Sequence, residues 1–371
     1  MESNIEEKNK RKQIQIQRIL HPSDQDIKDV AYNYALFQAN IQRFLPNLNI
    51  KNFEELYKQF RYHKCIVFFD QFDLKKLDEI CIVNNSGINI LPSNLKGPSI
   101  FATFHYGSYR VINSYLLKQG FKVVLIIDDF VYKDQKEKLE NLYLKHKEEA
   151  LKNNSDFIIL NVKEPAFIFK LKRLLLNGYV LVVYMDGNAG SLKKIDFNKG
   201  WLEIDFLNSK INVKSGIVAL SYILKASIVP VITCWDDNEN LEIKFYNSIS
   251  TSDYSDRNLY IKDTILKLYS ILEEKLYTNP TQWECWSYIH KWFEKKSLSP
   301  YEEIDIKNLK YEFNKHRYSL FSLKNEYYFF DKFSYLAFPI NENLYNLLRD
   351  NNISKIANNM LEDLINKNVI I

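Results

Sequence analysis

The chain has 371 residues, of which 46% are hydrophobic and 15% aromatic, so it contains ample material for a folded core and disorder is not expected. Its 50 basic and 46 acidic residues leave a formal net charge of +4, a balance too even to indicate a nucleic-acid-binding protein. Because single cores seldom grow beyond about 250 to 300 residues, the length predicts either one large decorated domain or two domains.

The N-terminal stretch predicts no targeting signal, because residues 1–12 are charged and contain no apolar run. The longest apolar runs, such as 123–127 and 179–185, have the length of strands and fall short of the about 20 residues that a membrane helix needs. We therefore expect a cytoplasmic protein, with a peripheral contact to the membrane left open. The four cysteines show no C-x-x-C spacing, which argues against a zinc site or a disulfide framework. His21, His63 and His316 have no carboxylate or cysteine at metal-ligand spacing, so no metal site is expected. No tightly bound cofactor is expected either.

Residues 1–90 carry helical patterns and predict an N-terminal helical region. Ser23 is followed three residues later by Asp26, which is a capping-box pattern, and apolar residues at helical spacing come next. Pro46 is expected to end this helix.

Between residues 91 and 295, short apolar runs alternate with amphipathic segments. The predicted strands are 100–104, 123–127, 157–160, 179–185 and 228–234. The predicted helices begin near Ser108, cover Leu139 and Leu142, extend from Pro165 to Gly178, span 216–224, and cover Ile261 to Leu272. This alternation predicts an α/β core in which a mostly parallel sheet is flanked by helices.

The pattern changes in the last part of the chain. Residues 296–315 read as a linker, and residues 316–371 predict a small α+β module of winged-helix-like type. Within it, Lys324 and Asn325 lie between two apolar segments and predict a hairpin. Two helices are expected to follow, one over Leu344 and its neighbours and a second one starting at Ser354.

His105 is the best catalytic candidate, because it directly follows an apolar strand and directly precedes Gly107 and Ser108 at a turn into a helix. Active sites of open α/β sheets form at the carboxyl ends of strands. A histidine there can act as a general base, since its ordinary pKa near about 6.5 lets it take a proton at neutral pH. Free N–H groups at the helix start are candidates for holding a developing negative charge. The alternative is a histidine that caps the helix or satisfies a buried carbonyl.

Several segments resemble, in order and spacing, the motifs of the lysophospholipid acyltransferase superfamily over residues 25–293. The resemblance is closer to the lipid A lauroyl and myristoyl acyltransferases. The segments that carry it are Phe101–Arg110, Leu171–Asp186, Ile204–Ser209, Lys214–Leu220, Ile228–Val231 and Asn279–Trp286.

This resemblance implies that His105 deprotonates an acceptor hydroxyl or amine, which then attacks the thioester of an acyl carrier protein or of coenzyme A. It also implies substrate-binding roles for residues around the first motif and the later glycine. These are Tyr106, Gly107, Ser108, Arg110, Ser215 and Gly216.

One departure from the family pattern concerns position 110, where an aspartate or glutamate is expected and Arg110 stands. Arginine cannot accept a proton or orient the histidine as a carboxylate would. Asp186 and Asp128, both at predicted strand ends, are the candidate replacements, and Asp186 is preferred. Arg110 is instead a candidate for holding a phosphate of the phosphopantetheine arm or a carboxylate of the acceptor.

Residues 316–371 resemble the recognition element of ribosomal-peptide modification systems, similar to the small chaperone of pyrroloquinoline quinone biosynthesis. That family adds a leader peptide as an extra strand to the edge of its sheet. The resemblance therefore implies a precursor peptide as a partner, with segment 327–330 offering the sheet edge. The alternative is a structural winged-helix-like appendage.

Three interpretations remain open. The first is an acyltransferase that acylates a ribosomally made peptide recruited by the C-terminal module. The second is a lysophospholipid or glycolipid acyltransferase of lipid A type, and the third is a non-catalytic partner that binds acyl chains or peptides. Neither a G-x-S-x-G elbow nor a P-loop motif occurs, which disfavours serine hydrolases and P-loop enzymes.

Overall fold

The computed structural model describes residues 2–48, 52–72, 76–84, 92–95, 97–150, 155–187, 200–294 and 311–371. The chain divides into two compact units. Unit 1 comprises residues 1–15, 59–206 and 210–285, and unit 2 comprises residues 16–58, 207–209 and 286–371.

The helices and strands have the following bounds. The helices are α1 (Glu2–Leu20), α2 (Asp24–Phe44), α3 (Phe53–Asp70), α4 (Lys76–Glu79), α5 (Val111–Lys118), α6 (Asp129–Ala150), α7 (Phe167–Leu176), α8 (Gly216–Leu224), α9 (Arg257–Thr278), α10 (Glu342–Arg349) and α11 (Asn358–Asn366). The strands are β1 (Cys81–Asn84), β2 (Ser99–Thr103), β3 (Lys122–Ile127), β4 (Asp156–Asn161), β5 (Tyr179–Tyr184), β6 (Trp201–Phe206), β7 (Ser209–Lys214), β8 (Ser227–Trp235), β9 (Leu241–Phe245), β10 (Tyr318–Leu323), β11 (Glu326–Asp331) and β12 (Leu336–Ile340). Within the part of the chain that is described, no helix is long and apolar enough to cross a membrane.

Unit 1 is built on a seven-stranded sheet with the order β1-β9-β8-β2-β5-β3-β4. The five strands from β8 to β4 are parallel to one another, whereas β9 pairs antiparallel with β8. The predicted fold class, a mostly parallel sheet flanked by helices, is confirmed. All residues of β2 are buried, as expected for a strand covered on both faces.

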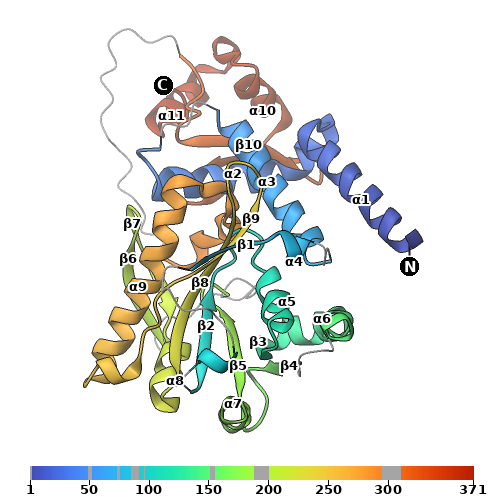
Figure 1. Ribbon diagram of the computed structural model, residues 1–371. Helices are drawn as coiled ribbons and strands as arrows, with labels where there is room; N and C mark the ends of the chain where they lie inside the picture. Colours follow the sequence, from blue (N-terminus) through green and yellow to red (C-terminus); the bar gives the residue numbers. More distant parts are fainter. Residues whose placement is uncertain are drawn as a thin grey trace. The chain divides into compact units, whose positions relative to one another are not determined.

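Helices cover both faces of this sheet. Figure 1 shows α5 and α6 on one side and α8 and α9 on the other. On the first side, Ile112, Leu116 and Leu117 of α5 pack in one buried apolar cluster with strand residues such as Phe101 and Val182. The parallel pairing of β2 with β5 places the residues that follow both strands at the same edge of the sheet.

The predicted helices and parallel strands of the core lie close to their expected positions, while three features were not expected. The strand β9 and the hairpin formed by β6 and β7 were missed, as was the short β1. The strands β1 and β9 extend the sheet beyond β8, and β6 and β7 form a separate two-stranded sheet, so none of them belongs to the β-α alternation on which the prediction was based. In the C-terminal segment, the helix predicted to start at Ser354 instead begins at Asn358, because residues 353–355 form a 3₁₀ turn.

Unit 2 contains a three-stranded antiparallel sheet with the order β10-β11-β12. The predicted hairpin is present, with Lys324 and Asn325 both at positive φ between β10 and β11. Because β11 is the central strand, segment 327–330 offers no free edge, and that part of the prediction is wrong. The helix α2 packs along β10, where Gln38 accepts a hydrogen bond from Ser319 and Tyr32 contacts Phe321.

The division into units groups residues 16–58 with the C-terminal segment, whereas the sequence patterns grouped residues 1–90 with the α/β core. The start of α2 itself is as predicted, with a reciprocal capping box between Ser23 and Asp26. The predicted linker 296–315 lies outside the described residues except for 311–315. A separate recognition role for residues 316–371 stays a prediction.

Candidate active site

His105 lies two residues beyond the end of β2, in a loop that is fixed by backbone contacts. The Gly107 N–H donates to the Gln282 carbonyl at 3.0 Å, and the Glu284 N–H donates to the His105 carbonyl at 2.9 Å. On the other side, the Thr233 hydroxyl donates to the Tyr106 carbonyl at 3.0 Å. Hydrogen bonds therefore hold the loop on two sides, from residues 282–284 and from the end of β8.

The close approach of the loop to β8 requires a glycine at position 107. Its φ is +56°, a left-handed conformation that favours glycine. A Cβ atom at this position would lie 2.2 Å from the Thr233 carbonyl oxygen, well inside van der Waals contact. The glycine therefore allows the loop to approach β8 closely, and its N–H is used by Gln282 rather than held free for a substrate.

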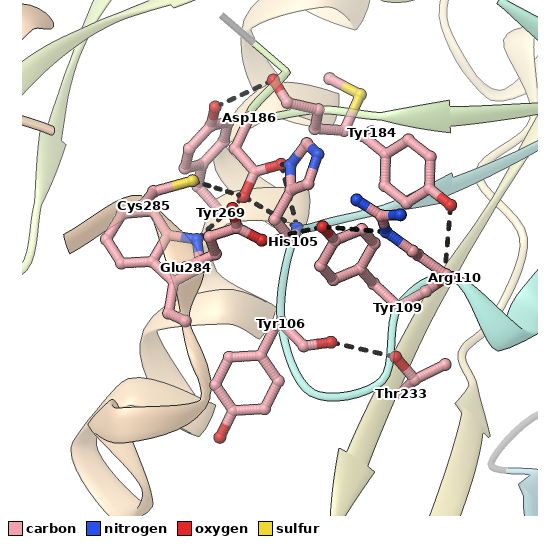
Figure 2. Close-up of polar contacts among 12 residues, drawn as sticks. His105, Tyr106, Tyr109, Arg110, Tyr184, Asp186, Thr233, Tyr269, Glu284 and Cys285 are labelled. Atoms are coloured by element: carbon pink, nitrogen blue, oxygen red, sulfur yellow. Dashed lines mark hydrogen bonds and ion pairs between the residues drawn. The ribbon is translucent and has the colours of Figure 1, made fainter. Parts of the chain in front are cut away.

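Asp186 lies two residues beyond the end of β5 and meets His105 directly (Figure 2). Its Oδ1 atom lies 2.7 Å from Nδ1 of the imidazole. The backbone N–H of His105 also donates to the same carboxylate, at 2.9 Å from Oδ2. The contact that the sequence predicted between these two side chains is thus present, and their catalytic role stays a proposal.

Two further side chains hold the fully buried Asp186 carboxylate in place. The indole Nε1–H of Trp283 donates to Oδ2 at 2.8 Å, and the Cys285 thiol donates to the same oxygen at 3.2 Å. Sequence reasoning placed both residues in a closing motif without a role at the site. They come from a segment of short 3₁₀ turns, where no periodicity indicates which side chains point inward.

The donor atoms of His105, Asp186 and Cys285 lie within 4.8 Å of one another, a grouping that can also bind a metal ion. In this structure the contacts at 2.7 and 3.2 Å are hydrogen-bond distances, and the shared carboxylate already has several N–H and S–H donors. The hydrogen-bonded arrangement accounts for all three side chains.

The environment shifts the pKa values of the pair in opposite directions. Burial alone would lower the pKa of His105, but the charge and hydrogen bond of Asp186, helped by Glu284, outweigh it and raise the pKa above 6.5. Burial would raise the pKa of Asp186, but His105 and the Trp283 hydrogen bond outweigh it and lower that pKa. The pair therefore favours an ionised carboxylate that orients the imidazole.

With Nδ1 occupied by Asp186, Nε2 is the nitrogen that can exchange a proton. The His105 side chain is 20% exposed, whereas Asp186 is not exposed at all. Among the described residues, none forms a hydrogen bond with Nε2. The imidazole thus presents one nitrogen to a substrate and the other to its orienting acid, the geometry that a general base needs.

A second group of polar residues lies beside the imidazole. The Tyr109 ring is 4.6 Å from the His105 ring, and its hydroxyl donates to Glu284 at 2.8 Å. Arg110 donates to Gln71 at 3.1 Å and reaches the Tyr109 hydroxyl at 3.4 Å. Figure 2 shows the Arg110 guanidinium between the rings of Tyr109 and Tyr184. None of these partners of Arg110 was identified from the sequence.

The neighbouring Tyr106 and Ser108 are directed into the protein. The Tyr106 hydroxyl donates to the carbonyl of Asn279 at 2.9 Å, and the buried Ser108 hydroxyl donates to Asp70 at 2.9 Å. These contacts anchor the loop to α9 and α3. A substrate-binding role for the two side chains stays a prediction, and its support lies only in their closeness to His105.

The other predicted site residues form no hydrogen bond with this loop among the described contacts. Ser215 and Gly216 stand at the start of α8, where the Ser215 hydroxyl donates to the Gly200 carbonyl at 3.2 Å. Asp128, the second candidate for the orienting acid, accepts a hydrogen bond from the Val131 N–H at the start of α6. Of the two acids, Asp186 is the one that contacts His105.

A cavity of about 260 Å³ lies at the other end of β5, lined by residues such as Leu95, Phe121, Leu175 and Tyr179. Because Tyr179 begins β5 and Asp186 follows its end, this cavity is at the opposite edge of the sheet from the imidazole.

No family model matches this chain, and no curated protein does. Among solved structures, the chain is similar to the 1-acyl-sn-glycerophosphate (LPA) acyltransferase PlsC from Thermotoga maritima, with 13% sequence identity and a TM-score of 0.31. That match covers 67% of this chain and 97% of the other. The function is therefore inferred from the site itself.

Proposed function

We propose that this chain is an acyltransferase that moves a fatty acyl group from the thioester of an acyl carrier protein or coenzyme A to an amine or hydroxyl of a ribosomally synthesised peptide. The observation that carries the proposal is the 2.7 Å contact between Nδ1 of His105 and Oδ1 of Asp186. This contact leaves Nε2 as the proton acceptor. No cofactor beyond the acyl donor is needed.

In the proposed reaction, Nε2 of His105 takes the proton of the acceptor hydroxyl or amine as its oxygen or nitrogen attacks the thioester carbonyl. The tetrahedral intermediate then collapses, the C–S bond breaks, and the imidazolium returns the proton to the leaving thiolate. Asp186 stays ionised throughout and stabilises the imidazolium. Acyl group and proton are both transferred, so no further reactant is required.

The developing oxyanion needs donors close to the base, and removing one such donor typically costs about 3 kcal/mol of barrier. The N–H groups of Tyr109 and Arg110 form no backbone hydrogen bond within the described residues and are candidates. The Arg110 guanidinium forms no ion pair with a described carboxylate and also lies beside the imidazole. We assign Arg110 to binding an anionic group of one substrate, either a phosphate of the acyl donor or a carboxylate of the acceptor.

The reason to consider a non-catalytic protein was the arginine at position 110. Asp186 makes the carboxylate contact that an acid at position 110 would otherwise make. This contact favours an acyltransferase over a non-catalytic binding protein.

The peptide half of the proposal rests on unit 2. The helix α2 packs along β10, while residues 336–339 of β12 are exposed. An exposed edge can accept an added strand through backbone hydrogen bonds. Attachment to the same chain would then raise the effective concentration of the acceptor for His105.

The catalytic half is tested with the purified chain, lauroyl-coenzyme A and lauroyl-acyl carrier protein, by following thiol release together with product mass. Candidate acceptors are peptides encoded by short reading frames next to the gene, with ethanolamine as a small surrogate. We expect His105→Ala to abolish acyl transfer and the exposed His21→Ala control to retain it. Turnover by His105→Ala within a few-fold of the unchanged chain would refute the role of His105 as the base.

The recruitment half is tested at β12. Pro339 has no N–H, which fits an edge position whose nitrogen faces away from β11, and Ala337 two residues earlier shares that orientation. Ala337→Pro should therefore lower turnover of the full-length peptide at low concentration and spare ethanolamine. Ala337→Val keeps the N–H and is the matched control. If the unchanged chain, Ala337→Pro and Ala337→Val turned over the peptide equally, unit 2 would not recruit the peptide and its role would be structural.

A further inference from the structure

The helix α7 carries an apolar surface that faces solvent. Leu171 and Leu175 are buried, as expected for the side that packs against β5. On the outside, Phe169 is 77% exposed, Leu176 is 68% exposed and Ile168 is 53% exposed. A helix that is apolar on its outer face as well as on its inner face is unusual for a surface helix of a globular protein.

The outer face of α7 combines these apolar side chains with cations. Phe169, Lys172, Arg173 and Leu176 follow the spacing i, i+3, i+4, i+7, so they share one side of the helix. Lys172 and Arg173 are exposed and form no ion pair with a described residue. Lys170, by contrast, is paired with Glu164 at 2.7 Å. We call these four residues together with Ile168 the α7 face.

We propose that the α7 face is the surface by which this protein lies on an anionic lipid membrane. An apolar strip flanked by lysine and arginine is the pattern of helices that rest in the interface, where the apolar side chains enter the lipid and the cations reach the headgroups. Lys172 and Arg173, which pair with no described acid, supply charge complementarity to an anionic leaflet. An acidic protein partner is the competing occupant, but three large apolar side chains beside only two cations favour lipid.

The position of α7 relates this surface to the active site within unit 1. The helix starts six residues after Asn161, the last residue of β4, and β4 is parallel to β3, β5 and β2. Its first turn therefore lies toward the same edge of the sheet as His105. The proposal itself rests on the exposure of the α7 face and not on the acyl-transfer chemistry.

The test is flotation of the full-length protein with vesicles of phosphatidylcholine and phosphatidylglycerol in a 7:3 ratio. We expect the unchanged chain to float and the Phe169→Asp/Leu176→Asp variant to lose at least about 10-fold in the bound-to-free ratio. Ile223→Asp, at a similarly exposed apolar residue of α8, is the matched control and should float like the unchanged chain. Because all three positions are exposed, the fold should survive, which circular dichroism checks.

Two further measurements distinguish binding to a lipid membrane from binding to an acidic protein. Lys172→Glu/Arg173→Glu should lower binding to the mixed vesicles and change little with pure phosphatidylcholine. In a Phe169→Trp chain, brominated lipids should quench fluorescence beyond the level seen with the unchanged chain. The proposal is overturned if the unchanged chain stays unbound, if the α7 variants float like it, or if the α7 face binds an acidic carrier protein and no vesicle. Activity plays no part in these readouts, so their failure would leave the proposed acyl transfer standing.

Discussion

The carboxylate of Asp186 contacts the imidazole of His105 although the two residues are 81 positions apart in the sequence. The register of two strands explains the meeting. In the parallel pair β2 and β5, Thr103 lies opposite Tyr184, so the residues two positions beyond each strand emerge side by side at one edge. The carboxylate that contacts His105 thus comes from the end of the neighbouring strand.

The first prediction concerns the pH dependence of acyl transfer. A general base works only when neutral, so the rate should fall as the pH drops through the pKa of His105, which Asp186 and Glu284 hold above 6.5 against the effect of burial. Asp186→Asn removes the group that raises the pKa of His105 most. The acid limb of the pH–rate profile, which is the pH range where the rate falls as His105 becomes protonated, should therefore move to lower pH. The plateau rate at higher pH should fall on the order of 100-fold or more. Rates measured between pH 5 and 9 decide this, and an unmoved acid limb would contradict it.

Glu284 provides a milder test of the same electrostatics. Its carboxylate raises the pKa of His105 without touching the imidazole in any described contact, and it accepts a hydrogen bond from Tyr109. Glu284→Gln should therefore shift the acid limb to lower pH by less than Asp186→Asn does, and the plateau rate should fall less. The same pH series measures both variants, and a larger shift for Glu284→Gln would reverse the assignment of the acid.

Trp283 is predicted to act as a positioning residue. Trp283→Phe keeps an aromatic ring but removes the indole N–H that donates to Asp186, which should raise the pKa of that carboxyl and cost about 1 to 3 kcal/mol of stability. Urea unfolding gives the stability, and the pH–rate profile shows whether His105 has lost its orienting acid. Trp201→Phe, outside the site, is the control and should leave the profile unchanged. A stability loss with an unchanged profile would make Trp283 merely structural.

The sequence was sufficient for the parts of this site that lie on regular elements. His105 and Asp186 each follow an apolar run that ends abruptly, and such runs mark strands whose ends share an edge of a parallel sheet. Trp283 and Cys285 could not be assigned in the same way. They reach Asp186 through an isolated bridge between Tyr106 and Trp283 and through irregular turns, which have no repeating pattern to read.

The same limit applies to the surroundings of Arg110. Its partner Gln71 follows the end of α3 and meets it across 39 residues, a contact that depends on how the helix packs. The prediction of the open edge of unit 2 was also wrong, because the sequence located a hairpin but not the third strand, β12, which makes β11 a central strand.

A further prediction concerns the effect of Arg110 on His105. It lowers the pKa of His105, so Arg110→Met should move the acid limb to higher pH, the opposite direction to Asp186→Asn. Arg110→Asp places an acid at position 110, yet it should not raise activity, because Nδ1 of His105 already binds Asp186. Comparing lauroyl-phosphopantetheine with lauroyl-pantetheine, and serine with serine amide as acceptors, shows whether a phosphate or a carboxylate contacts Arg110. An equal loss with all four substrates would remove it from substrate binding.

The last prediction concerns Gly107, which lets the loop that carries His105 approach β8. In Gly107→Ala the new Cβ would lie 2.2 Å from the Thr233 carbonyl oxygen and the residue would keep a φ of +56°, so we expect a loss of at least about 2 kcal/mol in the free energy of unfolding. Relief of the clash would have to move the loop, which would displace His105 from Asp186 and lower activity as well. Gly216→Ala is the matched control, because a Cβ there meets no atom within 4 Å and alanine suits a helix start, so its effect should stay near about 0.5 kcal/mol or less. Urea unfolding compares the stability of the two variants, and acyl transfer is measured for Gly107→Ala alone. Equal stability of the two would mean that the close approach of the loop to β8 is not needed.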